Sequence, residues 1–270
     1  MIELPETHVL TKQINETLVG KTIKSAVANA HPHGFAFYSG DCTAYGAMLS
    51  GQKITEARTG FAGDSCTEII CGDMLLQIGT PIKYHAAGEK LPKSHQLLLE
   101  FDDDSHMSCT VQMWGGMFCV PVTEVSEREH KPCPFTDAFD ENYFDSLVGS
   151  VKPTLSAKAF LATEQRVPGL GNGVLQDILF NARIHSKRKL ETIGDKDMQG
   201  LFQSVKSTLK EMRDSGGRDT EKDLFNRSGN YLTILSKNTL IHPCRVCGSG
   251  LVRQAYLGGN IYFCPVCQPL

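Results

Sequence analysis

Four cysteines near the C-terminus constrain this chain more than any other feature. They form two Cys-x2-Cys pairs with 16 residues between them: Cys244, Cys247, Cys264 and Cys267. This spacing is typical of a tetrahedral four-thiolate metal site, which leaves no coordination position open for a substrate. The sequence therefore predicts one structural Zn²⁺ ion, with iron as the minor alternative. Two disulfides, or four unrelated thiols, are the interpretation without a metal.

The segment between the two cysteine pairs is expected to form a β-hairpin, because residues 260–263 (NIYF) have the composition of a strand. A hairpin this short cannot bury a core without a metal ion. The other six cysteines occur singly along the chain, and we expect reduced thiols, several of them buried. They are Cys42, Cys66, Cys71, Cys109, Cys119 and Cys133.

The first half of the chain predicts one helix followed by many short strands. Leu10, Ile14 and Leu18 recur at helical spacing in a segment that begins at Pro5 and is terminated by Gly20. Short alternating runs separated by turn signals follow, which predicts an antiparallel sandwich or barrel. The runs are 22–27, 34–38, 68–71, 73–78, 95–101, 106–114 and 116–120.

The second half predicts helices, so the fold class is α+β with several domains. Helical periodicity covers 143–151, 156–162, 173–182 and, most clearly, 195–214. The proline-containing, charged stretch before it predicts a linker. We therefore expect a β-sandwich domain (1–125), a linker (126–142), a helical domain (143–240) and a cysteine hairpin (241–270).

The charge of the chain is divided unevenly between these halves. The formal net charge is −3, but residues 1–142 carry −9 and residues 143–270 carry +6. Such an asymmetry favours a nucleic-acid partner for the basic half, although a simple drift of surface charge is the alternative. No apolar run is long enough for a membrane span. The N-terminus lacks the basic and apolar regions of a signal peptide, so we expect a cytoplasmic protein.

A glycine-rich turn precedes one of the predicted helices. Gly171 and Asn172 follow Gly169-Leu170 and open the helix at 173–182. Backbone N–H groups at a helix N-terminus bind anions such as phosphate. Asn172 is expected to cap the helix and to donate to a phosphate oxygen. An ordinary turn between two helices is the alternative, and Lys237 is a further candidate for phosphate contact.

In combination, these features resemble the formamidopyrimidine-DNA glycosylase / endonuclease VIII family. The resemblance spans nearly the whole chain and follows the family's order of motifs. It is carried by residues 3–6 (ELPE), 165–172 (QRVPGLGN), 216–217 (GG), 229–231 (GNY), 243–248 (PCRVCG) and 263–268 (FCPVCQ).

The resemblance implies an N-terminal helix on a two-sheet β-sandwich, then a helix–two-turn–helix domain and a zinc hairpin, with DNA bound between them. It implies that Glu3 is a general acid toward the sugar ring, with Glu6 as a second catalytic carboxylate. Asn172, Gly171, Lys237 and Asn260 would contact DNA. The partner would be double-stranded DNA with a lesion or an abasic site, the flipped base being excised at the sugar. A monomer is expected.

The chain departs from the family at the nucleophile. The family uses the amine of an N-terminal proline, whereas position 2 here is Ile2. The amine of Met1 is the remaining candidate, displaced by up to about 3.5 Å. In addition, Gly259 stands where the finger usually carries an arginine, and Met117 or Phe118 is the candidate wedge for the gap left by a flipped base.

We therefore expect a DNA-repair protein of this family whose base excision is weakened or altered. One alternative is a non-catalytic protein that binds damaged DNA. Another is a zinc-stabilised protein-interaction module. Trp114 is expected in the core rather than on a stacking surface.

Overall fold

The computed structural model describes residues 2–60, 66–125 and 131–270. It divides into two compact units. Unit 1 comprises residues 1–130 together with Thr220–Gly229, and unit 2 comprises Lys131–Asp219 together with Asn230–Leu270. None of the helices in the described ranges is both long and apolar enough to cross a membrane.

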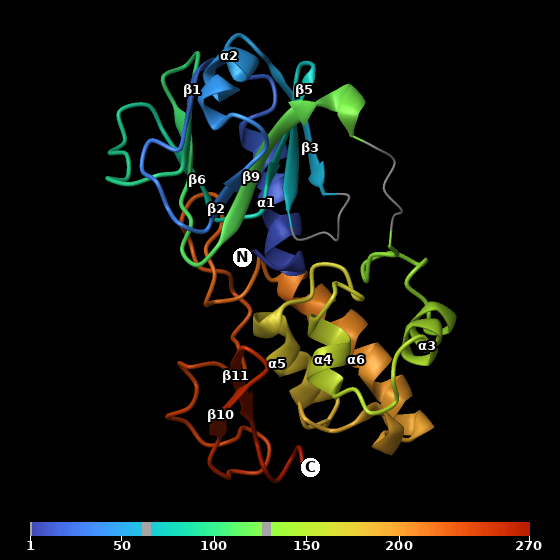
Figure 1. Cartoon of the computed structure of the whole chain (residues 1–270). Helices are drawn as coiled ribbons and strands as arrows, with labels where there is room; N and C mark the ends of the chain where they lie inside the picture. Colours follow the sequence, from blue (N-terminus) through green and yellow to red (C-terminus); the bar gives the residue numbers. More distant parts are fainter. Residues whose placement is uncertain (1, 61–65, 126–130) are drawn as a thin grey trace. The chain divides into compact units, whose positions relative to one another are not determined.

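Unit 1 confirms the predicted helix and sandwich (Figure 1). Helix α1 (Leu4–Thr17) begins with Pro5 in its first turn and buries Leu10 and Ile14. Two sheets follow, with strand orders β1-β7-β8-β6 and β2-β9-β5-β4-β3. The strands are β1 (Ile23–Ala28), β2 (Ala36–Tyr38), β3 (Ile54–Thr59), β4 (Thr67–Cys71), β5 (Met74–Ile78), β6 (Ile82–His85), β7 (Leu97–Phe101), β8 (His106–Cys109) and β9 (Gly115–Pro121).

Several elements of unit 1 differ from the prediction. Strands β3 and β6 and the short helix α2 (Tyr45–Leu49) were not predicted, because their sequences (ITEART, IKYH, YGAML) are too short or too polar for a clear period. The pairing is also not wholly antiparallel, since β2 runs parallel to β9. Three-residue 3-10 helices at Cys42–Ala44 and Val122–Glu124 complete the unit.

A segment from the second half of the chain completes unit 1. Leu224 is fully buried in the sandwich core. Its backbone N–H donates to Gln13 Oε1 on α1 (3.0 Å), and its carbonyl accepts from the N–H of Tyr84 on β6 (2.8 Å). The Tyr84 and Phe225 rings meet edge to face, with centroids 6.1 Å apart. Residues 220–229 are thus held by both backbone and side-chain contacts.

Unit 2 confirms the predicted helices and the C-terminal hairpin (Figure 1). The apolar stripe predicted over 195–214 forms α6, and five of its residues, including Leu201 and Leu209, are buried. The elements are α3 (Glu141–Gly149), α4 (Ala157–Ala162), α5 (Asn172–Asn181), a 3-10 turn (Leu190–Thr192), α6 (Asp195–Asp214), β10 (Val252–Tyr256) and β11 (Gly259–Phe263).

A buried carboxylate joins α5 to the segment that leads to the hairpin. Asp177 is fully buried, and its two oxygens accept the N–H groups of Ile234 (2.9 Å) and Leu235 (2.8 Å). Burial raises the pKa of Asp177 to about 6, because a low-dielectric site penalises the charged form. Asp177 therefore hydrogen-bonds the 231–235 segment, but above this pH its buried charge lowers the stability of the fold.

This cost predicts a specific pH dependence of stability. Folded protein keeps a proton on Asp177 up to about pH 6, whereas the unfolded chain releases it near the ordinary value of 3.8. As pH rises from 4 to 7, wild type should therefore lose about 2 kcal/mol of unfolding free energy relative to Asp177→Asn. Urea denaturation of both proteins across this range measures the difference. The exposed Asp145→Asn is the control, and parallel curves for wild type and Asp177→Asn would refute the assignment.

Candidate nucleic-acid interface and metal centre

The four cysteines predicted to bind metal converge in unit 2. Their Sγ atoms all lie within 4.8 Å of one another, with Cys244 and Cys267 at 3.7 Å and Cys247 and Cys264 at 3.4 Å. A tetrahedral shell with Zn–S bonds of about 2.3 Å needs sulfur atoms about 3.8 Å apart. The donor set and its spacing therefore fit a closed, structural Zn²⁺ site.

Ser249 supports the thiolate form of this cluster. Its Oγ lies 3.0 Å from Sγ of Cys247 and 3.0 Å from Sγ of Cys264. The hydrogen bond from Ser249 lowers the pKa of Cys247 to about 6. Metal binding requires thiolates, so this hydroxyl favours the ligand form near neutral pH.

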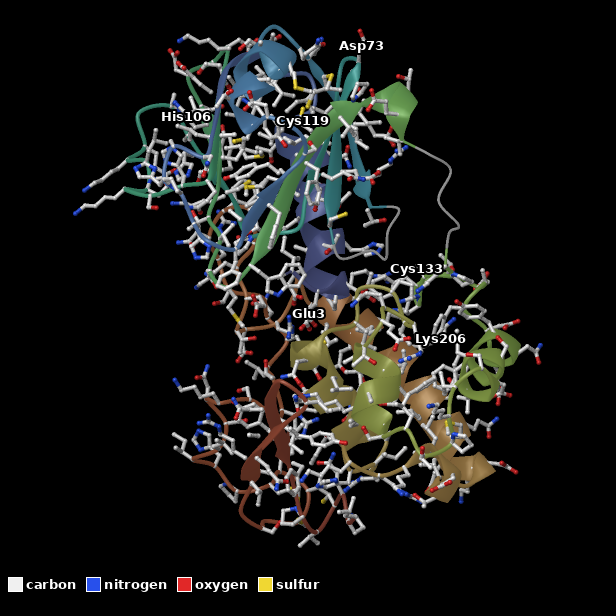
Figure 2. All side chains as sticks on the ribbon, in the orientation of Figure 1. Glu3, Asp73, His106, Cys119, Cys133 and Lys206 are labelled. Carbon is white, nitrogen blue, oxygen red and sulfur yellow. The ribbon has the colours of Figure 1, made fainter. Side chains whose placement is uncertain are left out.

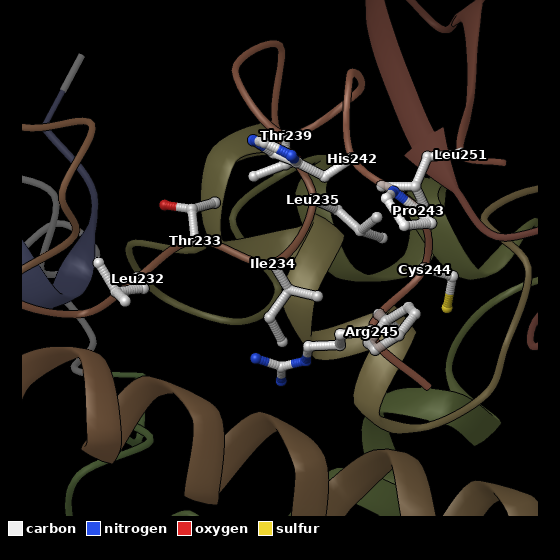
Figure 3. A pocket seen from close by; sticks show the side chains of 11 residues that line it. Leu232, Thr233, Ile234, Leu235, Thr239, His242, Pro243, Cys244, Arg245 and Leu251 are labelled. Carbon is white, nitrogen blue, oxygen red and sulfur yellow. The ribbon is translucent and has the colours of Figure 1, made fainter. Parts of the chain in front are cut away.

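The metal centre packs against the helices of its unit. Cys244, Cys264 and Cys267 share an apolar cluster with Phe180 of α5 and with Leu235. A pocket of about 180 Å³ lies beside Cys244 (Figure 3). The cysteine cluster is therefore continuous with the core that carries α5.

The glycine-rich turn opens α5, but its cap differs from the prediction. Gly171 is the N-cap residue, with extended backbone, and Asn172 is already the first helical residue. The expectation that Asn172 caps the helix is therefore wrong. Gly169 takes a positive φ of 66°, which a glycine adopts without strain, and Leu170 is fully buried. The turn thus fixes where α5 begins and leaves the Asn172 side chain available for another contact.

That contact joins α5 to the hairpin. Nδ2 of Asn172 donates to the backbone oxygen of Asn260 on β11 (3.0 Å). Gln176, one turn along α5, donates to the same oxygen (3.3 Å) and accepts the N–H of Tyr262 (3.0 Å). The structure thus brings Gly171, Asn172 and Asn260, three of the predicted DNA contacts, to one place.

Lys158 is a basic residue of this region that the sequence analysis missed. It lies on α4, is only 3% exposed, and donates from Nζ to the carbonyl of Tyr256 on β10 (2.8 Å). Burial lowers its pKa. Within the described residues no carboxylate pairs with it. The sequence signal that could have identified Lys158 is its place as the single charged residue in the apolar run AKAFLA.

Lys237 is the fourth predicted DNA contact. It is exposed in the turn at 236–239. In the part of the chain that the structure describes, Lys237 forms no hydrogen bond or ion pair with Asn172, Gly171 or Asn260. Its role stays a prediction.

The predicted catalytic carboxylates occupy the start of α1 in unit 1 (Figure 2). Glu3 is the N-cap residue, and its carbonyl accepts the N–H and the hydroxyl of Thr7 (3.0 and 3.1 Å). Glu6 lies in the first turn, and both glutamates are buried. Negative charge is stabilised at a helix N-terminus. Ile2 belongs to the sandwich core at 5% exposure, and Met1 lies outside the described residues.

The two candidate wedge residues, Met117 and Phe118, and the nearby Trp114 differ in exposure. Met117 is fully buried in the sandwich core, so it is not a free wedge. Trp114 is 46% exposed, which overturns its assignment to the core, and Met113 beside it is 73% exposed. Strand β8 ends at Cys109, so both side chains belong to the connection between β8 and β9. Phe118 is 37% exposed.

Comparisons with known proteins agree on one family. No protein-family model matches the chain. Curated proteins named formamidopyrimidine-DNA glycosylase match along the full length: that of Cytobacillus firmus is 26% identical, covering 99% of this chain and 100% of its own, and that of Bacillus licheniformis is 27% identical, covering 99% of each.

Solved structures agree in fold. The Lactococcus lactis Fpg in complex with DNA containing an abasic site has a TM-score of 0.84 at 22% identity, covering 99% of this chain and 100% of that one. The Thermus thermophilus MutM (Fpg) protein has a TM-score of 0.79 at 21% identity, covering 98% of each chain. These likenesses show the fold, and the curated relatives name the same family over the full length. Over its full length the chain is therefore similar in sequence to proteins named formamidopyrimidine-DNA glycosylase and similar in fold to the solved Fpg structures.

Proposed function

We propose that this protein is a DNA-repair protein that binds double-stranded DNA at a lesion or an abasic site. The observation that carries the proposal is the full-length match to proteins named formamidopyrimidine-DNA glycosylase. The Lactococcus lactis Fpg, which has the same fold, was solved with abasic-site DNA. The chemistry of unit 2 supports it, because Lys158 and Asn172 place hydrogen-bond donors together without a neighbouring carboxylate partner for the lysine. Phosphodiesters are bound by such groups.

On this proposal the residues of unit 2 position the DNA and do not read its sequence. Asn172 has one amide hydrogen left after its bond to Asn260, and this hydrogen is suited to a phosphate oxygen. The N–H groups at the start of α5 and the Lys237 ammonium add positive potential. The exposed Met113 and Trp114 supply apolar side chains of the kind that fill the gap left by a flipped base.

We further propose that base excision is weakened. The family reaction needs an amine that attacks the sugar carbon as the base departs. A Schiff base forms, and the DNA strand is then cut by elimination. The Ile2 side chain is buried in the core of unit 1, so the residue at position 2 contributes to packing. If the Met1 amine attacks instead, it begins one residue away, and a misplacement near 1 Å already costs on the order of 100-fold. Glu3 and Glu6 would remain as proton donors.

Non-catalytic binding of damaged DNA is the second candidate function. The packing of Ile2 favours it, because a buried side chain at position 2 serves stability whether or not an amine is used. A protein-interaction module, the third alternative, would bind no DNA in the experiments below.

We also propose that the four cysteines hold one structural Zn²⁺, and removal of this ion tests the role of the hairpin. Without the ion, the hairpin should lose its fold, and Asn260 should no longer stay against Asn172. Chelation should therefore abolish binding to abasic-site DNA. Fluorescence anisotropy before and after chelation, and after zinc is restored, measures this. Full binding by metal-free protein would contradict the proposal.

Replacing Asn172 tests the phosphate assignment. Asn172→Ala should weaken binding to every DNA sequence to about the same extent, by roughly tenfold, because a lost charge-assisted hydrogen bond is worth about 1.5 kcal/mol. Titration with several abasic-site duplexes of different flanking sequence measures the loss. Asn15→Ala, on α1 of unit 1, is a comparison variant. A loss confined to some sequences would argue for base contact instead.

Restoring a proline tests the weakened chemistry. In Ile2→Pro the small second residue permits removal of Met1 and exposes a secondary amine at position 2. Borohydride trapping on abasic-site DNA should then yield about 10- to 100-fold more covalent adduct than wild type gives.

Ile2→Ala is the matched control, because it also loses the buried side chain and exposes a primary amine at the same position. It should gain less adduct than Ile2→Pro. Circular dichroism verifies that both variants fold. If neither folded variant gains adduct while wild type binds abasic DNA, the non-catalytic function is favoured.

A further inference from the structure

A groove of about 290 Å³ lies in unit 2 between α6 and the segment at 134–137. The α6 wall contributes three cations, and the other wall contributes apolar side chains and one carboxylate. The cations are Lys206, Lys210 and Arg213, and the other wall contains Pro134, Phe135 and Asp137. None of these residues has been assigned above to the metal, to DNA or to catalysis. The groove is therefore a feature that the proposed function does not use.

The three cations lie on one face of α6. They recur at i, i+4 and i+7, so successive cations are about 6 Å and about 4.5 Å apart along the helix axis. Among the described residues that line the groove, Asp137 is the one carboxylate. Three cations and one carboxylate give a formal charge of +2, which attracts an anionic ligand.

Lys206 is held by neutral acceptors (Figure 2). Its Nζ donates to the carbonyl of Thr136 (3.1 Å) and to the carbonyl of Phe139 (2.9 Å). In the described parts of the chain, no carboxylate lies within ion-pair distance of it. The two carbonyls orient the ammonium without cancelling its charge, and one of its three N–H donors is left for a ligand.

The other two cations share one exposed carboxylate. Asp214 lies 2.6 Å from Nζ of Lys210 and 2.8 Å from a terminal nitrogen of Arg213. The Lys210 side chain is 66% exposed, and water screens an exposed pair of this kind, so it contributes little to stability. A carboxylate from another molecule can therefore join these cations at little cost.

The apolar wall restricts the kind of anion that fits. Pro134 is buried, and the ring of Phe135 lies under the guanidinium of Arg213, 4.4 Å from its centre. In an extended peptide, successive side chains point to opposite sides, and those on one side are about 7 Å apart. A peptide in which acidic and apolar residues alternate therefore matches both walls. A DNA backbone presents phosphates to a protein but no apolar side chains, so it matches the α6 wall alone.

We propose that this groove binds an acidic segment of a partner protein in an extended conformation. Its carboxylates contact Lys206, Lys210 and Arg213, and its apolar side chains contact Pro134 and Phe135. The inference goes beyond the proposed function, because it concerns a protein partner and needs no DNA.

The test uses a fluorescein-labelled peptide of the sequence Asp-Leu-Asp-Phe-Asp-Leu and the full-length protein. Fluorescence anisotropy at low salt should show saturable binding, and the affinity should fall as salt screens the exposed charges. The same peptide with Asn in place of each Asp should not bind. Absence of saturable binding by the acidic peptide, or equal binding by the Asn peptide, would overturn the proposal.

Ser207→Glu places a negative charge in the groove without removing a cation. Ser207 is exposed on α6, and its hydroxyl donates to the carbonyl of Gln203 within the helix (2.8 Å). Peptide binding should weaken by roughly tenfold, because the new carboxylate repels those of the peptide. Ser207→Gln is the matched control of the same length and should keep the wild-type affinity. An unchanged affinity in a folded Ser207→Glu protein would refute the assignment of the groove.

Lys206→Gln tests the cation itself. It should weaken peptide binding by about threefold, which is the range of a partly exposed ion pair. Lys196→Gln is the control, because this exposed lysine lies on α6 but about 15 Å away along the axis. Circular dichroism verifies that each variant folds.

Binding of an abasic-site duplex distinguishes a protein partner from DNA. Lys206→Gln and Ser207→Glu should both bind the duplex as wild type does. If they instead weaken duplex binding and leave peptide binding unchanged, the groove contacts DNA and the protein-partner proposal is overturned. A failure of wild type to prefer abasic-site DNA would count against the proposed function alone, since peptide binding is measured without DNA.

Discussion

The candidate interface depends on the amide side chains of α5 that hold the backbone of β11. Asn172 and Gln176 both donate to the carbonyl of Asn260, and Gln176 also accepts the N–H of Tyr262. These bonds satisfy backbone groups of an edge strand that water would otherwise solvate. They also fix how the zinc hairpin lies on the helix. Lys158, which donates to the carbonyl of Tyr256 on β10, also contacts the hairpin that these bonds hold.

The metal ion and these amides contribute differently to the structure of the hairpin. A four-thiolate shell closes the two knuckles and lets a short hairpin fold, but it does not determine how the hairpin lies on the helix. Apolar contacts of Cys244 and Cys264 with Phe180, together with the amide bonds, supply that orientation. Metal loss should therefore weaken binding by unfolding the hairpin, whereas Asn172 replacement should weaken it by removing a donor and one of the bonds that orient the hairpin.

Features encoded by local periodicity were predictable from the sequence, whereas those that depend on register were not. The stripe of α6 and the cysteine spacing predicted an element and a cluster with little error, because neighbours in sequence determine both. Trp114 was misplaced because alternation continues past the end of β8 although the pairing stops. The contact of Lys158 could not be predicted, because its hydrogen bond to the carbonyl of Tyr256 joins residues 98 positions apart in the chain.

Position 2 shows how packing and chemistry separate within one fold. Ile2 contributes to the same core as Leu10 and Leu224, so burial of its side chain stabilises the fold of unit 1. The donors assigned to DNA lie in unit 2, whereas Ile2 lies in unit 1. On the proposed function, a change at position 2 would therefore affect the nucleophile and leave the phosphate contacts of unit 2 in place. On the proposed function, unit 2 binds damaged DNA, while the buried Ile2 side chain contributes packing to unit 1.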